Sequence, residues 1–324
     1  MRIRLHIILV LSLVSLVTGC TGFQNSLFEK GIAYERGKSD LVPQTIKVND
    51  LNVSYLERQG SGETIVLVHG FGADKDSWVR FVRHLPEDFR VIAVDLPGHG
   101  STTMDWKTTY SIDYITQAFA NTMDALHLNN FHLAGNSMGG YVSVLYASSH
   151  PEKVQTLCLI DPAGAVSPQL SDREIALNHG TNPLVPRNRD EFETLLEYGF
   201  HNQPFMPWPA RSVLAEKYIA RSRINEKIWS DIMENKVVVE NYLGKLSMPV
   251  LLFWGDRDRI IHISTVSVFE KHVPKMKTVI FKDCGHVPML EIPRESAQEY
   301  TAFLSEQPGG RNGGITINAS VRNE

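Results

Sequence analysis

The sequence predicts an α/β fold with a mostly parallel central sheet, flanking helices and a helical cap. Three observations support this prediction. Short apolar runs rich in β-branched residues recur along the chain, as expected of strands that are buried on both faces. Helical patterns separate these runs, and such alternation indicates βαβ units. One long interval breaks the alternation, which indicates an inserted segment.

The individual elements follow in order along the chain. The first is a hairpin with strands over 45–48 and 51–57, joined by Asn49-Asp50. The buried strands are then expected at 64–68, 90–94, 130–134, 154–160, 250–254 and 277–281. The helices are expected at 77–84, 111–126, 139–149, 262–271 and 294–305. Ligands of such a sheet bind at the carboxyl ends of its strands.

The domain boundaries follow from this pattern. The core is expected over 45–163 and 248–306, and a helical cap over 164–247. The cap contains a Pro and aromatic stretch at 204–209, which is equally compatible with a membrane-contacting lid and with packing inside the cap. The tail over 307–324 is rich in Gly and Asn, and its composition predicts disorder.

The N-terminal residues have the pattern of an export signal. Basic residues precede an apolar run over 5–17, which is short for a membrane span. Val17-Thr18-Gly19-Cys20 resembles the bacterial lipobox. This resemblance implies a lipoprotein signal peptide over 1–19, acyl chains on Cys20 and a linker over 20–44 that holds at most a short helix. Thr21 follows Cys20, where the inner-membrane retention signal usually has Asp, so an outer-membrane or cell-surface location is expected. The alternative is an uncleaved transmembrane anchor.

The composition excludes some classes of function. The chain has 324 residues and a net charge of −4, so nothing suggests nucleic-acid binding. No cofactor or metal is expected, and a monomer is expected. Of the three Cys, Cys158 lies in an apolar run and Cys284 precedes Gly285. Two free thiols are favoured over a disulfide between them.

The segment Gly135-Asn136-Ser137-Met138-Gly139 has the Gly-x-Ser-x-Gly pattern. A predicted strand precedes it and a predicted helix follows, which is the context of a nucleophile elbow. The sharp turn would lift the hydroxyl of Ser137 above the sheet. We therefore predict that Ser137 is a nucleophile and not an incidental serine in a glycine-rich turn.

A serine nucleophile needs a base. His286 follows the last predicted strand, from which it can reach back over the carboxyl end of the sheet. His201 and His262 are weaker candidates, and the chain has 12 His in all. His69 and His99 lie in glycine-rich turns, which they are expected to shape.

The base needs an acid that orients it. Asp256 and Asp258 follow the strand over 250–254, and Asp161 follows the strand over 154–160. From the residues alone these three alternatives remain open. The order Ser, Asp, His along the chain is typical of hydrolases of this architecture.

The oxyanion formed during acyl transfer needs backbone N–H donors. His69-Gly70-Phe71-Gly72 follows the strand over 64–68, where such a donor is expected. The N–H groups of Phe71 and Met138 are the candidates. A plain glycine turn is the alternative for this segment.

Taken together, these motifs resemble the α/β-hydrolase superfamily over residues 45–305. Within it, the stretch from His69 to Trp78 and the elbow resemble the bacterial lipase 1 and monoacylglycerol lipase group. This resemblance implies that the acid is Asp258, three residues after Gly255. It also implies that Asn136, where the group often has Thr or His, affects specificity more than mechanism. The motifs are 69–72, 95–100, 135–140, 161–164, 254–258 and 285–286.

The predicted function is hydrolysis of carboxylic esters, with acylglycerols or other acyl esters as substrates and the membrane reached through Cys20. Ser137, not Asp, at the nucleophile position argues against haloalkane dehalogenases and epoxide hydrolases. Two alternatives remain. One is a C–C bond hydrolase or a cofactor-free haloperoxidase or perhydrolase, and the other is a non-catalytic ligand-binding lipoprotein.

Overall fold

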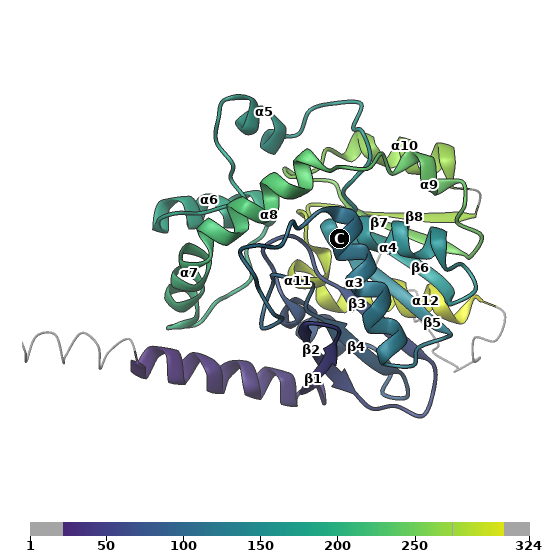
Figure 1. The fold of residues 1–324 in the computed structure, drawn as a ribbon, viewed down its shortest axis with the longest axis horizontal. Helices are drawn as coiled ribbons and strands as arrows, with labels where there is room; N and C mark the ends of the chain where they lie inside the picture. The colour runs from purple at the N-terminus through teal and green to yellow at the C-terminus, as the bar shows by residue number, and fades with distance from the viewer. Residues whose placement is uncertain (1–21, 274, 308–324) are drawn as a thin grey trace, which may run out of the picture.

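The computed structural model describes residues 22–273 and 275–307. An eight-stranded sheet runs through its centre, in the order β1-β2-β4-β3-β5-β6-β7-β8 (Figure 1). β2 pairs antiparallel with β1 and β4, and the other pairs are parallel. The predicted fold class is confirmed. The strands are β1 (Val42–Val48), β2 (Leu51–Arg58), β3 (Thr64–Val68), β4 (Arg90–Val94), β5 (Phe131–Asn136), β6 (Val154–Ile160), β7 (Val250–Gly255) and β8 (Met276–Phe281).

Helices cover both faces of the sheet, because the central strands are apolar on both sides. One face packs against α3 (Ile112–Ala125), α4 (Met138–Ser149) and α10 (Val266–His272), which follows η2 (Ile263–Thr265). The other face packs against η1 (Lys75–Trp78), α2 (Val79–Val82), α11 (Pro288–Glu291) and α12 (Pro293–Ser305). Two apolar cores result, one on each side of the sheet.

Helices also fill the interval between β6 and β7. They are α5 (Asp172–Asn178), α6 (Arg189–Gly199), α7 (Ala210–Ala220), α8 (Ser222–Glu234) and α9 (Glu240–Leu243). Phe192, Leu196 and Ala215 form a small apolar cluster of their own between α6 and α7. In the stretch before α7, Phe205 and Trp208 are 83% and 63% exposed, so these two rings do not pack inside the cap.

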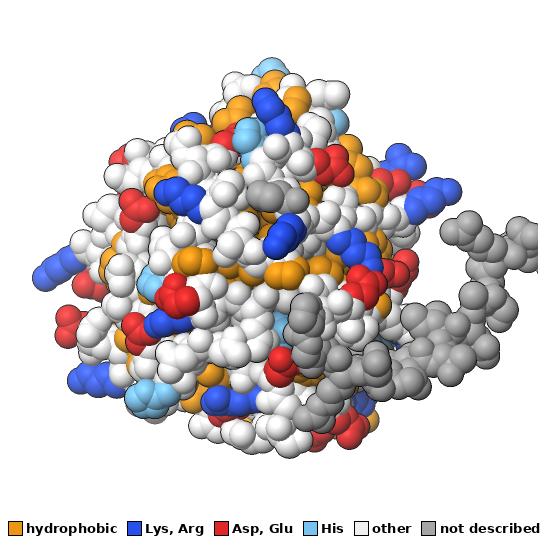
Figure 2. Space-filling view, turned by 90° about the vertical axis from the view of Figure 1, so that its right-hand side faces the viewer, with side chains coloured by type: hydrophobic (Ala, Val, Ile, Leu, Met, Phe, Trp, Pro, Cys, Tyr) orange, Lys and Arg blue, Asp and Glu red, His pale blue; other side chains and the backbone are white. Residues whose placement is uncertain are grey.

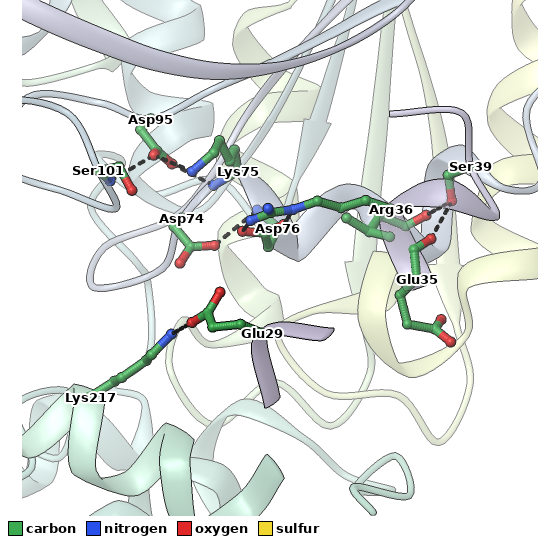
Figure 3. Close-up of polar contacts among 11 residues, drawn as sticks. Glu29, Glu35, Arg36, Ser39, Asp74, Lys75, Asp76, Asp95, Ser101 and Lys217 are labelled. Carbon is green, nitrogen blue, oxygen red and sulfur yellow. Dashed lines mark hydrogen bonds and ion pairs between the residues drawn. The ribbon is translucent and has the colours of Figure 1, made fainter. Parts of the chain in front are cut away.

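The segment before β1 differs from the linker expected over 20–44. Residues 22–37 form one helix, purple in Figure 1, and β1 begins three residues before the predicted strand. Arg36 forms an ion pair with Asp76 at 2.6 Å, and Glu29 pairs with Lys217 of α7 at 2.7 Å (Figure 3). Phe28 is buried on the same side of the helix. Ion pairs therefore hold this helix against the body and against α7. A search of the sequence for apolar periodicity does not detect such pairs.

The surface and the cysteines agree with the composition. In Figure 2, acidic and basic side chains are interspersed over the face shown, with apolar side chains in small groups between them. Cys158 and Cys284 are both buried and free, which confirms the prediction of two free thiols.

Within the described residues, no helix combines the length and the apolar character that crossing a bilayer requires.

Candidate active site

Ser137 lies in the sharp turn between β5 and α4. Its backbone has φ 55° and ψ −119°, a conformation that costs a non-glycine residue free energy and clusters at functional sites. The Ser137 N–H donates to the carbonyl of Ile160 at 3.0 Å, which fixes the turn to the end of β6. The elbow geometry predicted from the sequence is therefore present around Ser137.

The two glycines of the pentapeptide are required by close backbone contacts. A Cβ atom at Gly135 would lie 2.3 Å from the carbonyl oxygen of Gly139. A Cβ atom at Gly139 would lie 2.2 Å from the carbonyl oxygen of Val68 in β3. Any side chain at either position would push α4 away from the sheet and displace Ser137.

His286 lies on the loop between β8 and α11, beside the elbow. Its Nδ1 is 2.7 Å from Oδ2 of Asp258, and both side chains are buried. Nε2 of His286 is buried and has no hydrogen-bond partner among the described residues. An imidazole held at Nδ1 and open at Nε2 can accept a proton from a neighbouring hydroxyl.

Asp258 is held on its other oxygen as well. Its Oδ1 accepts the N–H groups of Ile260 at 2.7 Å and Ile261 at 3.0 Å. Asp256, the alternative two residues earlier, lies 3.8 Å from Arg257 instead. Of these two carboxylates, only Asp258 contacts His286 in the described part of the chain.

Asp161 lies at the end of β6, next to this pair. It is fully buried, and its Oδ1 accepts the N–H of Gly255 at 2.9 Å. Burial raises the pKa of Asp161 well above its usual range, and the nearby charge of Asp258 raises that pKa further. Burial next to Asp258 therefore favours the protonated form of Asp161.

The three side chains could also be considered as metal ligands. Asp161, Asp258 and His286 offer ligand atoms within 4.8 Å of one another. The bond between Asp258 and His286 already uses one ligand atom of each, and the other Asp258 oxygen and one oxygen of Asp161 accept backbone N–H groups. This arrangement favours proton transfer over cation binding.

The loop after β3 packs against the elbow. A Cβ atom at Gly70 would lie 3.1 Å from Cβ of Ser137, so the backbone of this loop runs next to the predicted nucleophile. Met138 is the first residue of α4, and its N–H has no acceptor within the helix. The two predicted oxyanion donors, Phe71 and Met138, thus belong to the two backbone segments that flank Ser137.

The two histidines in glycine-rich turns shape those turns. His69 accepts the N–H of Leu96 at Nε2, 3.0 Å away, and contacts the carbonyl of Gly70 through Nδ1. Burial lowers the pKa of His69 to about 4 and that of His99 to about 3, so both are neutral at pH 7. His69 thereby ties the loop after β3 to the loop after β4.

The other two candidate bases make different contacts from those of His286. The Nδ1 of His262 contacts the hydroxyl of Ser264 at the start of η2. The backbone N–H of His201 donates to Glu291 at 3.1 Å. Cys20, the predicted lipidation site, lies outside the described residues.

Several residues that hold the site were not singled out from the sequence. Lys75 and Asp95 form a buried ion pair at 2.7 Å, with side chains 5% and 0% exposed. Asp95 also accepts the backbone N–H groups of Lys75 and Ser101, so both of its oxygens have partners. This pair joins the loop that contains Phe71 to the loop after β4. A lysine next to two aspartates gives no sequence signal that it will be buried.

Asn136 joins the elbow to the His286 loop. Its amide donates to the carbonyls of Ile160 and His286, each at 3.1 Å. The side chain is buried and links segments that are 150 residues apart in the sequence. It therefore helps to position His286, and its predicted effect on specificity stays a prediction.

Glu291 joins the cap to the same loop. Its carboxylate accepts the N–H groups of Gly285 at 2.9 Å and of Asn202 at 2.6 Å. The N–H of His286 itself donates to the carbonyl of Gly199 at 3.0 Å. Such long-range backbone contacts have no pattern in the sequence by which they could have been found.

The fold, together with a serine in the sharp turn between a strand and a helix, defines the class of this protein as a hydrolase. A family model described as the alpha/beta hydrolase fold matches residues 63–293. The chain belongs to the α/β-hydrolase family, as its motifs predicted.

Similar proteins narrow the group. Lipase 1 of Psychrobacter immobilis is 32% identical over 297 residues, which cover 89% of this chain and 93% of that protein. Monoacylglycerol lipase ABHD6 of Homo sapiens is 29% identical over 263 residues, covering 78% of each chain. A solved structure titled as a membrane phospholipase A, a novel bacterial virulence factor, has a TM-score of 0.87 and 39% identity, and the match covers 94% of this chain and 99% of that one.

Proposed function

We propose that this protein hydrolyses acylglycerol-type or related acyl esters, with Ser137 as nucleophile, His286 as base and Asp258 as the acid that orients it. The broader class, a serine ester hydrolase of the lipase type, follows from the family and from the relatives named lipase and monoacylglycerol lipase. The observation that carries the assignment is the 2.7 Å contact between His286 and Asp258, beside a serine with φ 55°.

The proposed reaction has two stages. Nε2 of His286 takes the proton of Ser137 while Oγ attacks the acyl carbonyl. The backbone N–H groups of Phe71 and Met138 stabilise the oxyanion, and His286 then gives the proton to the departing alcohol. In the second stage, water attacks the acyl-enzyme with His286 again as base, which releases the carboxylic acid and restores Ser137.

The triad assignment is tested by Ser137→Ala. We expect kcat on p-nitrophenyl esters and on monoacylglycerols to fall by about 10⁴-fold or more, because the covalent route is lost. Undiminished turnover would overturn the assignment. The control is Ser149→Ala, which removes a serine hydroxyl that bonds only to the carbonyl of Leu145 at the end of α4.

Two measurements on the wild-type protein separate the remaining alternatives. A fluorophosphonate probe labels a reactive serine, so absence of labelling would indicate a non-catalytic ligand-binding protein. A labelled protein that hydrolyses no ester of any chain length would indicate a C–C bond hydrolase or a perhydrolase. A preference for medium or long acyl chains supports the proposed lipase.

We also propose that Cys20 carries acyl chains and anchors the protein to the bacterial outer membrane or cell surface as a monomer. Two observations support this. The helix over 22–37 starts two residues after Cys20. Phe23 and Tyr34 on this helix are 62% and 65% exposed, so apolar surface lies close to the anchor. Apolar side chains on a surface helix favour binding at a lipid interface.

Cys20→Ser tests the anchor. The variant cannot be acylated, so we expect it to move from the membrane fraction to the soluble fraction, or to remain unprocessed with residues 1–19 attached. Mass spectrometry of the N-terminus distinguishes a processed, acylated chain from an uncleaved one. An unmodified Cys20 within an intact N-terminus in the wild type would contradict the proposal and indicate a transmembrane anchor.

A further inference from the structure

Arg173 lies in the first turn of α5, in the part of the cap that is fastened to the loop of Asp258. The N–H of Arg173 donates to the carbonyl of Arg259 at 3.0 Å. The guanidinium of Arg259 in turn binds the carboxylate of Asp172 at 2.6 Å. These two contacts hold the start of α5 against Arg259, the residue that follows Asp258, the proposed catalytic acid.

The side chain of Arg173 lies beside a pair of aromatic rings, Trp229 and Phe71. Its guanidinium carbon is 5.6 Å from the ring centroid of Trp229 in α8. The Trp229 ring contacts the ring of Phe71, with centroids 5.5 Å apart. Phe71 is one of the proposed oxyanion donors, so a single tryptophan separates the Arg173 guanidinium from the catalytic loop.

The guanidinium of Arg173 is mostly buried and lacks a strong partner. The side chain is 17% exposed, and Nε is buried with no hydrogen-bond partner among the described residues. Its ion pair with Glu174 measures 3.7 Å, which is too long for a hydrogen bond. The other oxygen of Glu174 is already used by the backbone N–H of Ser171, at 2.8 Å, in a capping box.

Arg58 shows how this chain treats a guanidinium that serves only structure. Arg58 is 4% exposed, and it donates to the carbonyls of Phe89, Val82, Leu85 and Pro86. All three of its nitrogens have acceptors. Arg173 is less enclosed than Arg58, but its buried Nε has no acceptor among the described residues, which is costly unless a ligand supplies one.

The electrostatic environment agrees with a location near the catalytic acid. Burial lowers the pKa of Arg173 from its ordinary value, while the carboxylates of Glu174 and Asp258 oppose that shift. The guanidinium remains a cation at any physiological pH. It therefore lies within electrostatic reach of Asp258, which contacts His286.

We propose that Arg173 binds the anionic phosphodiester of a glycerophospholipid or lysophospholipid substrate while the scissile ester lies at Ser137. The planar guanidinium matches the oxygens of a phosphodiester, and Trp229 offers an apolar surface beside them. Only a few bonds separate the phosphate from the acyl esters in such a lipid. This inference deepens the proposed ester hydrolysis and rests on it.

The test compares two substrates that share one acyl chain and differ in the phosphodiester. The full-length protein and its Arg173→Gln variant are assayed on palmitoyl lysophosphatidylcholine and on monopalmitoylglycerol. We expect Arg173→Gln to lower kcat/KM about 10–100-fold on the lysophospholipid, as loss of a charge-assisted hydrogen bond predicts. On the monoacylglycerol we expect a change of less than about threefold. Arg173→Lys keeps the charge and should recover part of the lysophospholipid activity.

The controls separate specificity from folding. Arg187→Gln removes an exposed guanidinium elsewhere in the cap and should leave both substrates unchanged. Equal losses on both substrates for Arg173→Gln and Arg173→Lys would overturn the inference, because Arg173 would then be structural. Thermal unfolding of each variant shows whether it is folded. If Arg173→Gln has lost its fold, the ratio of kcat/KM on the two substrates is compared for Arg173→Lys instead.

Two further outcomes distinguish the inference from the proposed function. A wild type that hydrolyses monopalmitoylglycerol but not lysophosphatidylcholine would overturn the inference and leave the function standing. A wild type that hydrolyses neither substrate nor any p-nitrophenyl ester would overturn the function itself. Palmitate, the product released from both substrates, is a second anion that the guanidinium of Arg173 can bind. Weaker inhibition by palmitate in Arg173→Gln, with lysophospholipid kcat/KM unchanged, would assign Arg173 to the product carboxylate and overturn the phosphodiester assignment.

Discussion

The loops at the carboxyl edge of the sheet and the helices of the cap are held by different forces. In the loops, buried bonds and backbone contacts fix each group, as in the pairs of Lys75 with Asp95 and His286 with Asp258. In the cap, several of the ion pairs are exposed. The side chains of Arg189 and Glu216 are 58% and 44% exposed in their pair. In the proposals above, the catalytic groups thus lie on the more strongly fixed part, and the residue proposed to select the substrate lies on the cap.

This difference teaches which changes each region tolerates. A side chain at Gly135 or Gly139 would meet backbone atoms, which cannot move without displacing β3 or α4. A change at an exposed cap pair removes an interaction that solvent already screens. We therefore expect substitutions near the sheet edge to alter catalysis or folding strongly, and most cap substitutions to alter substrate preference alone.

The largest expected effect contrasts the two buried aspartates. Asp258→Asn removes the charge that orients His286, and we expect kcat to fall by about 10⁴-fold. Asp161→Asn changes a carboxyl that is bonded to the N–H of Gly255 and not to His286 within the part of the chain that the structure describes, and whose pKa is raised by burial, so we expect kcat to change by less than about tenfold. Steady-state kinetics on one p-nitrophenyl ester checks both. The reverse ranking would make Asp161 the orienting acid.

The sequence alone predicted the sheet edge well, because local backbone requirements leave local patterns. The strand–Gly-x-Ser-x-Gly–helix context predicted an elbow at Ser137, and the structure has positive φ there. Apolar β-branched runs predicted strands such as β3 and β4, which are buried on both faces. The preference for Asp258 over Asp256 came from family resemblance and not from spacing.

What the sequence did not predict depends on contacts between distant residues. The helix over 22–37 was expected to be mainly a linker, because it has few apolar residues on the face that docks. Its attachment relies on Arg36 and Glu29 finding partners in η1 and α7. Asn136 likewise acts through a carbonyl 150 residues away. Periodicity reports burial of apolar faces, but it does not report which charges or amides will meet.

The next effect concerns the buried ion pair of Lys75 and Asp95, which holds the loop that contains Phe71. Lys75→Met leaves the carboxylate of Asp95 buried with its strongest partner missing, so we expect the free energy of unfolding to fall by about 3–5 kcal/mol. Lys153→Met is the matched control, because its partner Asp124 is 60% exposed and the expected cost is at most about 1 kcal/mol. Denaturant unfolding measures both. Equal costs for the two variants would contradict the contrast between buried and exposed pairs.

Acid stability offers a smaller effect from the same edge. Burial lowers the pKa of His69 to about 4 in the folded protein, whereas an unfolded histidine has the ordinary pKa of 6.5. The unfolded chain therefore binds protons first, and stability falls as pH drops from about 6.5 to 4. The contribution of His69 reaches about 3 kcal/mol at pH 4. Burial raises the pKa of Asp74 to about 6, which opposes this trend in part. The slope of Tm against pH should flatten in His69→Gln, and an unchanged slope would contradict the assignment.

The smallest expected effect lies at the contact between the N-terminal helix and the cap. Lys217 pairs with Glu29 at 2.7 Å and lies 4.4 Å from the ring centroid of Phe28, but the two charged side chains are about half exposed. Lys217→Ala should therefore lower the free energy of unfolding by no more than about 1 kcal/mol. Arg36→Ala breaks the less exposed, two-bonded pair with Asp76 and should cost more. If Lys217→Ala costs as much as Arg36→Ala in denaturant unfolding, the cap is fixed as firmly as the sheet edge. Specificity would then reside in a rigid cap, and substitutions there would carry folding costs like those at the elbow.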